Sequence, residues 1–336
     1  MAGIELTARP VAGSVDELLA GATGRAPMDK HVDSLSGSGF ERATVDGRAC
    51  VVKHTGYHLD WLARALGDRD CWALTMWRTG LLDALPDRID HTVLGMALDA
   101  ATGRVSMLMT DVGDRLVPPG SDPLPEHSQL RFLDNMARMH ATFWGFEDRY
   151  RLLGPGERYQ ALTPATGARE AAQGHDDPVP RALAGGWAAL REAAPRAHDD
   201  ALALVTDPAP LVAALAETPA TLVHGDWKAG NLGEHPDGRT ILLDWGWPGR
   251  AGPLVDVAWY LAVNCDRLPV SKEDTIEAYR RSLAGTGVEV GDWWDRQLEL
   301  ALLGGFLQLG WSKKGDRAEL DWWLRRAAPV ARDLLA

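Results

Sequence analysis

The period of the apolar residues changes along the chain, and this change limits the fold more than any other feature of the sequence. Residues 30–55 alternate between apolar and polar side chains on both sides of a glycine-containing turn, and again around Asp46-Gly47. Alternation with a period of two is typical of half-buried strands, and Asp-Gly is a common hairpin turn. The segment is therefore predicted to form three short antiparallel strands.

Helical spacing and two further strands complete the N-terminal part. Ser14 and Glu17 form a capping box that predicts a short first helix. From Leu59 to Leu85 apolar residues recur at intervals of three and four, which predicts helix with a break at Gly67. Two apolar segments, "HTVLGMALD" and "RVSMLMTDV", then flank the turn "AATG" and are predicted to be strands. Residues 1–110 are thus expected to form one small antiparallel sheet with a helix packed on it.

The chain becomes mainly helical after this point. The segment 116–128 is rich in Pro, Gly and Ser and is expected to lead out of the first lobe. Helical periodicity follows, interrupted by two short apolar runs in "TLVHGDWKAGNLG" and "TILLDWGWPG", which are expected to form a hairpin-like pair. The expected fold class is α+β, with an N-terminal lobe at 1–110, a hinge at 111–115 and a helical C-terminal lobe at 116–336.

The length, charge and cysteine content of the chain limit the kinds of partner and location that we expect for the protein. A chain of 336 residues suits two lobes better than one core. The formal net charge of -12 disfavours nucleic acid and anionic membranes, and a cationic partner is favoured only weakly. Three cysteines without metal-ligand spacing are expected to be reduced core residues. Because the N-terminus lacks a basic start followed by an apolar core, and no segment reaches the length of a membrane helix, we expect a cytoplasmic protein.

The loop "HGDWKAGN" combines polar groups that suit phosphoryl transfer. That reaction needs a carboxylate to orient the attacking hydroxyl and accept its proton, hard oxygen ligands for Mg²⁺, and positive charge near the phosphates. Asp226 is the predicted base, and Lys228 is predicted to neutralise charge on the transferred group. Asn231 and Asp244, at the end of the next apolar run, are the predicted metal ligands. His224 is predicted to fix the loop through backbone contacts rather than to act as the base.

In these motifs the sequence resembles the aminoglycoside phosphotransferase and choline kinase family, which has the fold of protein kinases. "HGDWKAGN" is similar to the family's catalytic loop and "LLDWGWPG" to its metal-binding segment. "GPLVDVAWYLA" resembles the following helix start, where an aspartate, here Asp256, braces the catalytic loop. The resemblance runs from about residue 30 to the C-terminus. It implies an ATP- and Mg²⁺-dependent kinase that phosphorylates a hydroxyl of an aminoglycoside, a sugar or an amino alcohol.

The resemblance also assigns residues that contact the nucleotide. It implies that Lys53 pairs with the phosphates, and Val51 and Lys53 face the same side of their strand. The alternative is a surface lysine at a strand end. The family places a glutamate on the next helix to hold this lysine, but no Glu occurs between Glu41 and Glu126, so Asp70 is assigned by position. A plain helix-cap acid is the alternative there. The other assigned residues are Gly37, Ser38 and Gly39 in a glycine-rich turn, and Thr110 and Val112 at the adenine.

Several interpretations stay open. A catalytically silent protein of the same fold would bind a ligand without turnover, and a metal-dependent hydrolase could use His224, Asp226 and Asp244. His140 is expected to be a hydrogen-bonded core histidine. Two sets of residues are candidates for the acceptor site, with core packing and a solvated surface as their alternatives: the tryptophans Trp245, Trp247, Trp311 and Trp322, and the acids Asp266, Glu273, Asp292 and Asp316.

Overall fold

The protein divides into two compact units. The computed structural model describes residues 6–29 and 37–336. Unit 1 comprises residues 1–120 and 229–246, and unit 2 comprises residues 121–228 and 247–336. Unit 1 thus extends past the predicted hinge at 111–115 to residue 120, and it also contains the segment with Asn231 and Asp244. The chain crosses between the units within the predicted catalytic loop, after Lys228.

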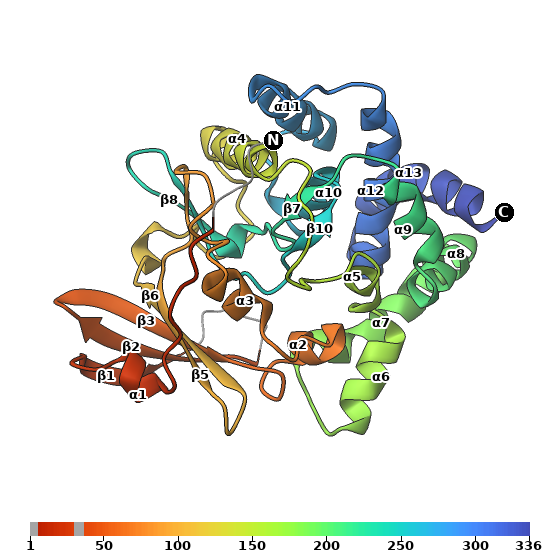
Figure 1. Ribbon diagram of the computed structural model, residues 1–336. Coiled ribbons are helices and arrows are strands. Elements are labelled where there is room, and N and C mark those ends of the chain that lie inside the picture. The colour runs from red at the N-terminus through yellow and green to blue at the C-terminus, as the bar shows by residue number, and fades with distance from the viewer. Residues whose placement is uncertain (1–5, 30–36) are drawn as a thin grey trace. The chain divides into compact units, whose positions relative to one another are not determined.

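Unit 1 is built on a five-stranded antiparallel sheet with the strand order β1-β2-β3-β6-β5 (Figure 1). Its strands are β1 (Thr23–Met28), β2 (Gly39–Val45), β3 (Arg48–Thr55), β5 (Val93–Asp99) and β6 (Arg104–Thr110). Asp46 and Gly47 join β2 to β3 with positive φ angles of 49° and 75°, as the hairpin prediction requires. The strand expected before the glycine turn falls largely on residues 30–36, outside the described residues, and the first described strand is β1.

The predicted broken helix of unit 1 is confirmed. It consists of α2 (Trp61–Leu66) and α3 (Trp72–Arg78), and Gly67 ends α2 in the left-handed conformation with φ 74°. The capping box is confirmed as well, since the Ser14 hydroxyl accepts the Glu17 amide at the start of α1 (Val15–Leu18). Both α1 and α3 contact β5. A core cluster of unit 1 contains Leu19, Cys50, Val52 and Leu108.

A second, three-stranded sheet in unit 1 carries part of the predicted site. Its order is β4-β9-β8, with β4 (Ile89–Asp90), β9 (Thr240–Leu242) and β8 (Leu232–Glu234). The expected hairpin is therefore formed by β8 and β9. The earlier apolar run, β7 (Thr221–Val223), was assigned to the wrong partner: it pairs with β10 (Gly249–Ala251) in unit 2. The short turn 235–239 connects β8 to β9, which pair with each other, and β7 pairs with a strand farther along the chain.

Unit 2 is mainly helical. Its long helix α12 (Trp293–Leu309) contacts α10 (Leu254–Val263) and α13 (Arg317–Leu335), and α4 (Glu126–Thr142) contacts α11 (Lys272–Gly285). The Ser271 hydroxyl accepts the Asp274 amide and caps α11 as predicted. None of the helices among the described residues is long and apolar enough to cross a membrane. The remaining elements are α5 (Glu157–Gln160), α6 (Pro164–Ala172), α7 (Pro178–Ala193), α8 (Pro195–Thr206), α9 (Ala209–Ala216), η3 (Cys265–Arg267) and η4 (Gly310–Gly315).

Candidate active site

The predicted catalytic loop of unit 2 starts where the buried strand β7 ends. Gly225 has φ 83°, a conformation that glycine adopts without steric cost. A Cβ atom at this position would lie 2.4 Å from the Trp247 carbonyl oxygen and 2.5 Å from a guanidinium nitrogen of Arg158. The chain therefore passes too close to its neighbours at this position for any residue other than glycine.

Asp256, in the first turn of α10, holds the backbone of this loop. Its two carboxylate oxygens accept the amides of His224 at 2.9 Å and Gly225 at 2.7 Å. One oxygen also lies 3.1 Å from Nε2 of His140, whose Nδ1 lies 2.7 Å from the Tyr279 hydroxyl. Burial acts to raise the pKa of Asp256, but the hydrogen bond and charge of His140 and the loop contacts outweigh it and lower that pKa. His140 is thus the buried, hydrogen-bonded histidine that the sequence predicts.

A buried arginine lies behind the loop. The Arg158 guanidinium is almost completely buried and donates a hydrogen bond to the Trp247 carbonyl at 3.2 Å. Burial lowers its pKa, and the charge of Asp256 acts against this shift. Within the described residues its Nε atom has no hydrogen-bond partner. Sequence reasoning missed Arg158, because nothing in "GERYQ" distinguishes this arginine from an exposed one.

The side chain of Asp226 is fixed at both oxygens. Oδ1 accepts the indole N–H of Trp259 at 3.0 Å, and Oδ2 lies 3.1 Å from the ammonium group of Lys228. Its backbone amide donates to Nδ1 of the buried His224 at 3.1 Å. The geometry gives His224 a scaffold role in the loop and gives Asp226 a buried carboxylate with defined orientation.

In unit 1, Lys53 and Asp244 meet although they lie far apart in sequence. Lys53, on β3, places its ammonium group 2.9 Å from Oδ1 of Asp244, directly beyond β9. Asp244 has φ 64°, an uncommon conformation for a residue other than glycine and one that clusters at functional sites. The Leu243 amide donates to the Asn231 carbonyl at 2.9 Å and so holds both ends of the hairpin together. A carboxylate and an amide oxygen are donors that fit Mg²⁺.

Two aspartates near the start of the broken helix differ in burial. Asp70 is exposed in the turn before α3. Asp60 is buried at the N-terminus of α2, where it accepts the Leu62 amide at 2.9 Å. Burial raises the pKa of Asp60, and the charge of Lys53 lowers it. Asp60, whose only sequence signal is that of a helix cap, is thus a second candidate beside Asp70 for the carboxylate that acts on Lys53.

The glycine-rich turn makes a close backbone contact. A Cβ atom on Gly37 would lie 1.7 Å from the Leu59 carbonyl oxygen, so only glycine fits. A hydrogen bond from the Gly37 amide also lowers the pKa of Asp60. Ser38 is fully buried, and Gly39 begins β2 opposite His54. Residues 34–36 of the same predicted turn lie outside the described residues.

The segment assigned to adenine follows β6. The Thr110 amide donates to the Thr92 carbonyl at 3.0 Å, at the end of the sheet. Val112 is buried, and its carbonyl accepts the Arg115 amide at 2.9 Å in the short helix η1 (Gly113–Arg115). The predicted hinge residues are thus ordered by backbone hydrogen bonds of unit 1.

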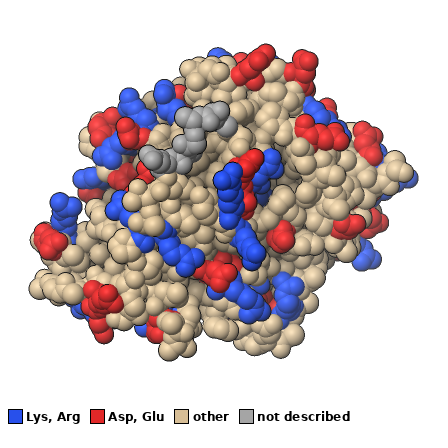
Figure 2. Space-filling model, in the orientation of Figure 1, with Lys and Arg blue, Asp and Glu red and all other residues tan. Residues whose placement is uncertain are grey.

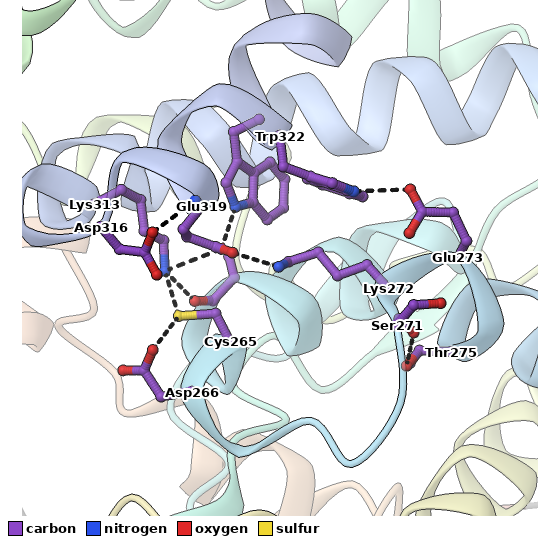
Figure 3. A network of polar contacts seen from close by, with 12 residues as sticks. Cys265, Asp266, Ser271, Lys272, Glu273, Thr275, Lys313, Asp316, Glu319 and Trp322 are labelled. Carbon is purple, nitrogen blue, oxygen red and sulfur yellow. Dashed lines mark hydrogen bonds and ion pairs between the residues drawn. The ribbon is translucent and has the colours of Figure 1, made fainter.

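Several acceptor candidates of unit 2 belong instead to an internal polar network (Figure 3). Glu273 accepts the Trp322 indole N–H at 2.8 Å and pairs with Arg326. The cationic groups of Lys272 and Arg326 lie 5.0 Å and 3.8 Å from the centre of the Trp322 ring. This tryptophan and this acid therefore already have partners of the kind that a cationic acceptor would offer.

The same network accounts for two more of the polar residues. Asp316 accepts the Glu319 amide at 3.0 Å and caps α13. Glu319 pairs with Lys272, and Lys313 lies 3.1 Å from the sulfur of Cys265 (Figure 3). Burial raises the pKa of the Cys265 thiol. Cys265 is nevertheless partly exposed, so the expectation of three core cysteines holds only for the buried Cys50 and Cys71.

The remaining tryptophan candidates of unit 2 differ in what surrounds them. Trp311 is a packing residue, because its indole donates to the Gln308 carbonyl at 2.8 Å and its ring lies against Gly186. The Trp247 ring lies 5.4 Å from the Trp259 ring, next to Asp226. Of the tryptophans of unit 2 proposed for the acceptor, Trp247 is thus the one beside the predicted base.

Comparison with known proteins places the fold. No family model matches the chain, and no curated protein sequence matches it significantly. Choline kinase LicA from Streptococcus pneumoniae is similar in structure, with a TM-score of 0.52, 13% sequence identity and 96% coverage of both chains. A thermostable mutant of aminoglycoside phosphotransferase APH(4)-Ia is similar with a TM-score of 0.46 and 16% sequence identity, and the match covers 93% of this chain and 95% of that chain. Aminoglycoside phosphotransferase APH(3'')-Id from Streptomyces rimosus is similar with a TM-score of 0.44 and 19% sequence identity, and the match covers 86% of this chain and 92% of that chain. The chain therefore has the α+β, protein-kinase-like fold of a choline kinase, as the sequence motifs predict.

Proposed function

We propose that the protein is a kinase that transfers the γ-phosphoryl group of ATP to a hydroxyl of a small-molecule acceptor. The observation that carries this proposal is the arrangement of Asp226. A buried carboxylate with one oxygen on an indole N–H and the other beside an ammonium group is held in one orientation. A general base must be placed in this way, within hydrogen-bond reach of the proton that it accepts.

In the proposed reaction the acceptor oxygen attacks the γ-phosphorus atom, and the bond to the leaving oxygen of ADP breaks. Asp226 orients the hydroxyl and accepts its proton. Lys228 neutralises charge on the transferred group, which its position beside the Asp226 carboxylate supports. Positioning and charge stabilisation supply most of the catalysis in reactions of this kind.

Residues of unit 1 are proposed to bind the nucleotide and the metal. Asn231 and Asp244 would hold Mg²⁺, which supplies positive charge to the phosphates when it is bound. We propose that Lys53 pairs with the phosphates and that Asp60, rather than Asp70, helps to hold it. The glycine-rich turn, Gly37, Ser38 and Gly39, and the segment with Thr110 and Val112 are proposed to contact phosphate and adenine.

The acceptor is proposed to be an aminoglycoside, a sugar or an amino alcohol. The similar structure is named a choline kinase, and choline is an amino alcohol. The net charge of -12 favours a cationic acceptor, although this effect is weak. The three free cysteines fit a reducing compartment, so we propose a cytoplasmic location.

A screen for acceptor-dependent ADP release tests this function. Purified protein with Mg-ATP is expected to release ADP faster when the correct hydroxylated compound is added. Replacing Asp226 with Ala should lower kcat by about 10²- to 10⁴-fold, because the base is lost. Nucleotide affinity, measured by titration calorimetry, should stay nearly unchanged. The matched control Asp333→Ala, at an exposed aspartate, should keep full activity; substantial activity in Asp226→Ala would overturn the assignment.

A catalytically silent ligand-binding protein is the second candidate. One observation favours it: Lys53 is paired with Asp244, so the two groups proposed for phosphate and metal neutralise each other in this structure. Under this alternative, ATP or the small molecule would bind in calorimetry, but none of the acceptors would accelerate ADP release. The same screen therefore separates the two functions.

A further inference from the structure

We propose that Trp259 is a positioning residue for the general base, and this inference rests on the proposed function. Its indole N–H donates to Oδ1 of Asp226 at 3.0 Å. The terminal torsion of an aspartate side chain is soft and does not by itself select which oxygen points where. A directional donor on one oxygen removes that freedom. Oδ2, the oxygen beside Lys228, is then the one that meets the acceptor hydroxyl.

The helix that carries Trp259 makes it a rigid donor. Asp256 and Trp259 are three residues apart in α10, so their side chains leave the same face of the helix. Asp256 binds the backbone of the catalytic loop at His224 and Gly225, while Trp259 binds the side chain of Asp226. One helix face therefore fixes both the path of the loop and the orientation of its carboxylate.

The indole ring is itself held in place. It is buried, and the Trp247 ring packs against it at 5.4 Å with the planes tilted by 42°. The carbonyl of Trp247 accepts a hydrogen bond from the buried Arg158. A donor fixed on both sides in this way suits a catalytic group that must stay within a fraction of an ångström of its working position.

Two variants test the role of the indole N–H. Trp259→Phe keeps an aromatic ring, and replacement of Trp259 by benzothienylalanine keeps the shape of the indole while sulfur replaces the N–H group. Both are expected to lower kcat by about 10- to 100-fold through misorientation of the base. KM for ATP and for the acceptor should change by less than about twofold, because binding contacts are retained.

The control is Trp293→Phe. This residue also donates an indole hydrogen bond, to the Glu289 carbonyl at 3.1 Å, but it lies at the start of α12 and not at the catalytic loop. It should leave kcat unchanged. If the benzothienylalanine variant keeps the kcat of the wild type, the positioning role is wrong, while the proposed kinase function stands.

A spectroscopic readout does not depend on turnover. In ¹⁵N–¹H spectra the Trp259 indole signal is assigned by its absence in Trp259→Phe. Asp226→Asn should shift this signal more than any other indole signal, because it removes the charge of the acceptor. An unmoved signal would show that the hydrogen bond does not exist in solution. If the wild type turns over none of the acceptors, the proposed function fails, and this measurement still decides whether Trp259 holds Asp226.

Discussion

Two buried aspartates of this protein show how local donors decide the charge of a carboxyl group. Asp256 accepts two loop amides and contacts His140, which together keep its pKa low despite complete burial. Asp68 accepts backbone donors, among them the Trp72 amide at 3.0 Å. Burial is the larger effect there and raises the pKa of Asp68 to about 7. Burial thus shifts this carboxyl group toward its neutral form.

Asp68 should make the stability of the protein depend on pH. Its folded-state pKa of about 7 lies above the unfolded value of about 3.9. Between these values the folded state binds more protons, so the free energy of unfolding should fall as pH rises, by at most about 4 kcal/mol. Asp68→Asn keeps an acceptor for the Trp72 amide but cannot ionise, and should flatten this dependence. Urea unfolding at about pH 5 and about pH 8 measures the effect.

The exposed Asp87 provides the control for this measurement, and Asp87→Asn should keep the pH dependence of the wild type. An unchanged pH dependence in Asp68→Asn would show that the pKa of Asp68 is not raised in the folded protein.

At the residue scale, the sequence predicts those site residues that lie in one loop or directly after a strand. Asp226, Asn231 and Asp244 were assigned in this way. Trp259 and Asp60 were not, because their contacts depend on packing between residues far apart in the chain. The indole of Trp259 and the carboxylate of Asp226 are 33 residues apart in sequence. Only the folded chain identifies such partners.

At the scale of elements, helix α4 contacts the strand and the helices that surround the predicted catalytic loop. His140, near its C-terminal end, contacts Asp256 of α10 and Tyr279 of α11, and its carbonyl accepts the Thr221 hydroxyl of β7 at 2.7 Å. One buried imidazole thus joins three helices, and its backbone joins the strand that leads into the loop. Removal of the imidazole would leave two buried polar groups with fewer partners.

His140→Phe should therefore be destabilising. The phenylalanine ring fills much of the volume of the imidazole but donates no hydrogen bond to the buried Asp256 carboxylate. We therefore expect the free energy of unfolding to fall by about 2 to 4 kcal/mol. Thermal unfolding measures it. His198→Phe is the matched control, because His198 is also buried, but its partner is the exposed Asp199 on the same helix. If His140→Phe lowers the free energy of unfolding no more than His198→Phe does, the role of His140 is contradicted.

Elements with strong local signals were predicted well from the sequence, and long-range strand pairing was not. The break at Gly67, the cap at Ser271 and the Asp46-Gly47 hairpin each depend on residues within a few positions of one another. The pairing of β7 with β10 joins segments separated by the whole β8–β9 hairpin. Periodicity shows that such a strand exists but does not specify its partner.

At the scale of the whole molecule, charge is distributed without a single dominant patch on the face shown in Figure 2. Acidic and basic side chains are interspersed among large uncharged areas. A net charge of -12 therefore does not by itself locate an acceptor site. Of the acids of unit 2 that the sequence offers for a cationic acceptor, Glu273 and Asp316 are hydrogen-bonded within the protein.

The two units contribute different parts of the proposed reaction. Unit 2 contains the proposed base Asp226 with Lys228, and unit 1 contains Lys53 with the proposed metal ligands Asn231 and Asp244. Asp226 and Asn231 are only five positions apart in the chain, although they belong to different units.

The most direct test of the kinase function is to observe the transfer itself. ³¹P NMR of the wild-type protein with Mg-ATP and the best acceptor from the screen should show a phosphomonoester signal that grows as the γ-phosphate signal of ATP declines. Asp226→Ala should produce it at about one-hundredth of that rate or less. Release of inorganic phosphate in place of a phosphomonoester, or an equal rate in Asp226→Ala, would contradict the account.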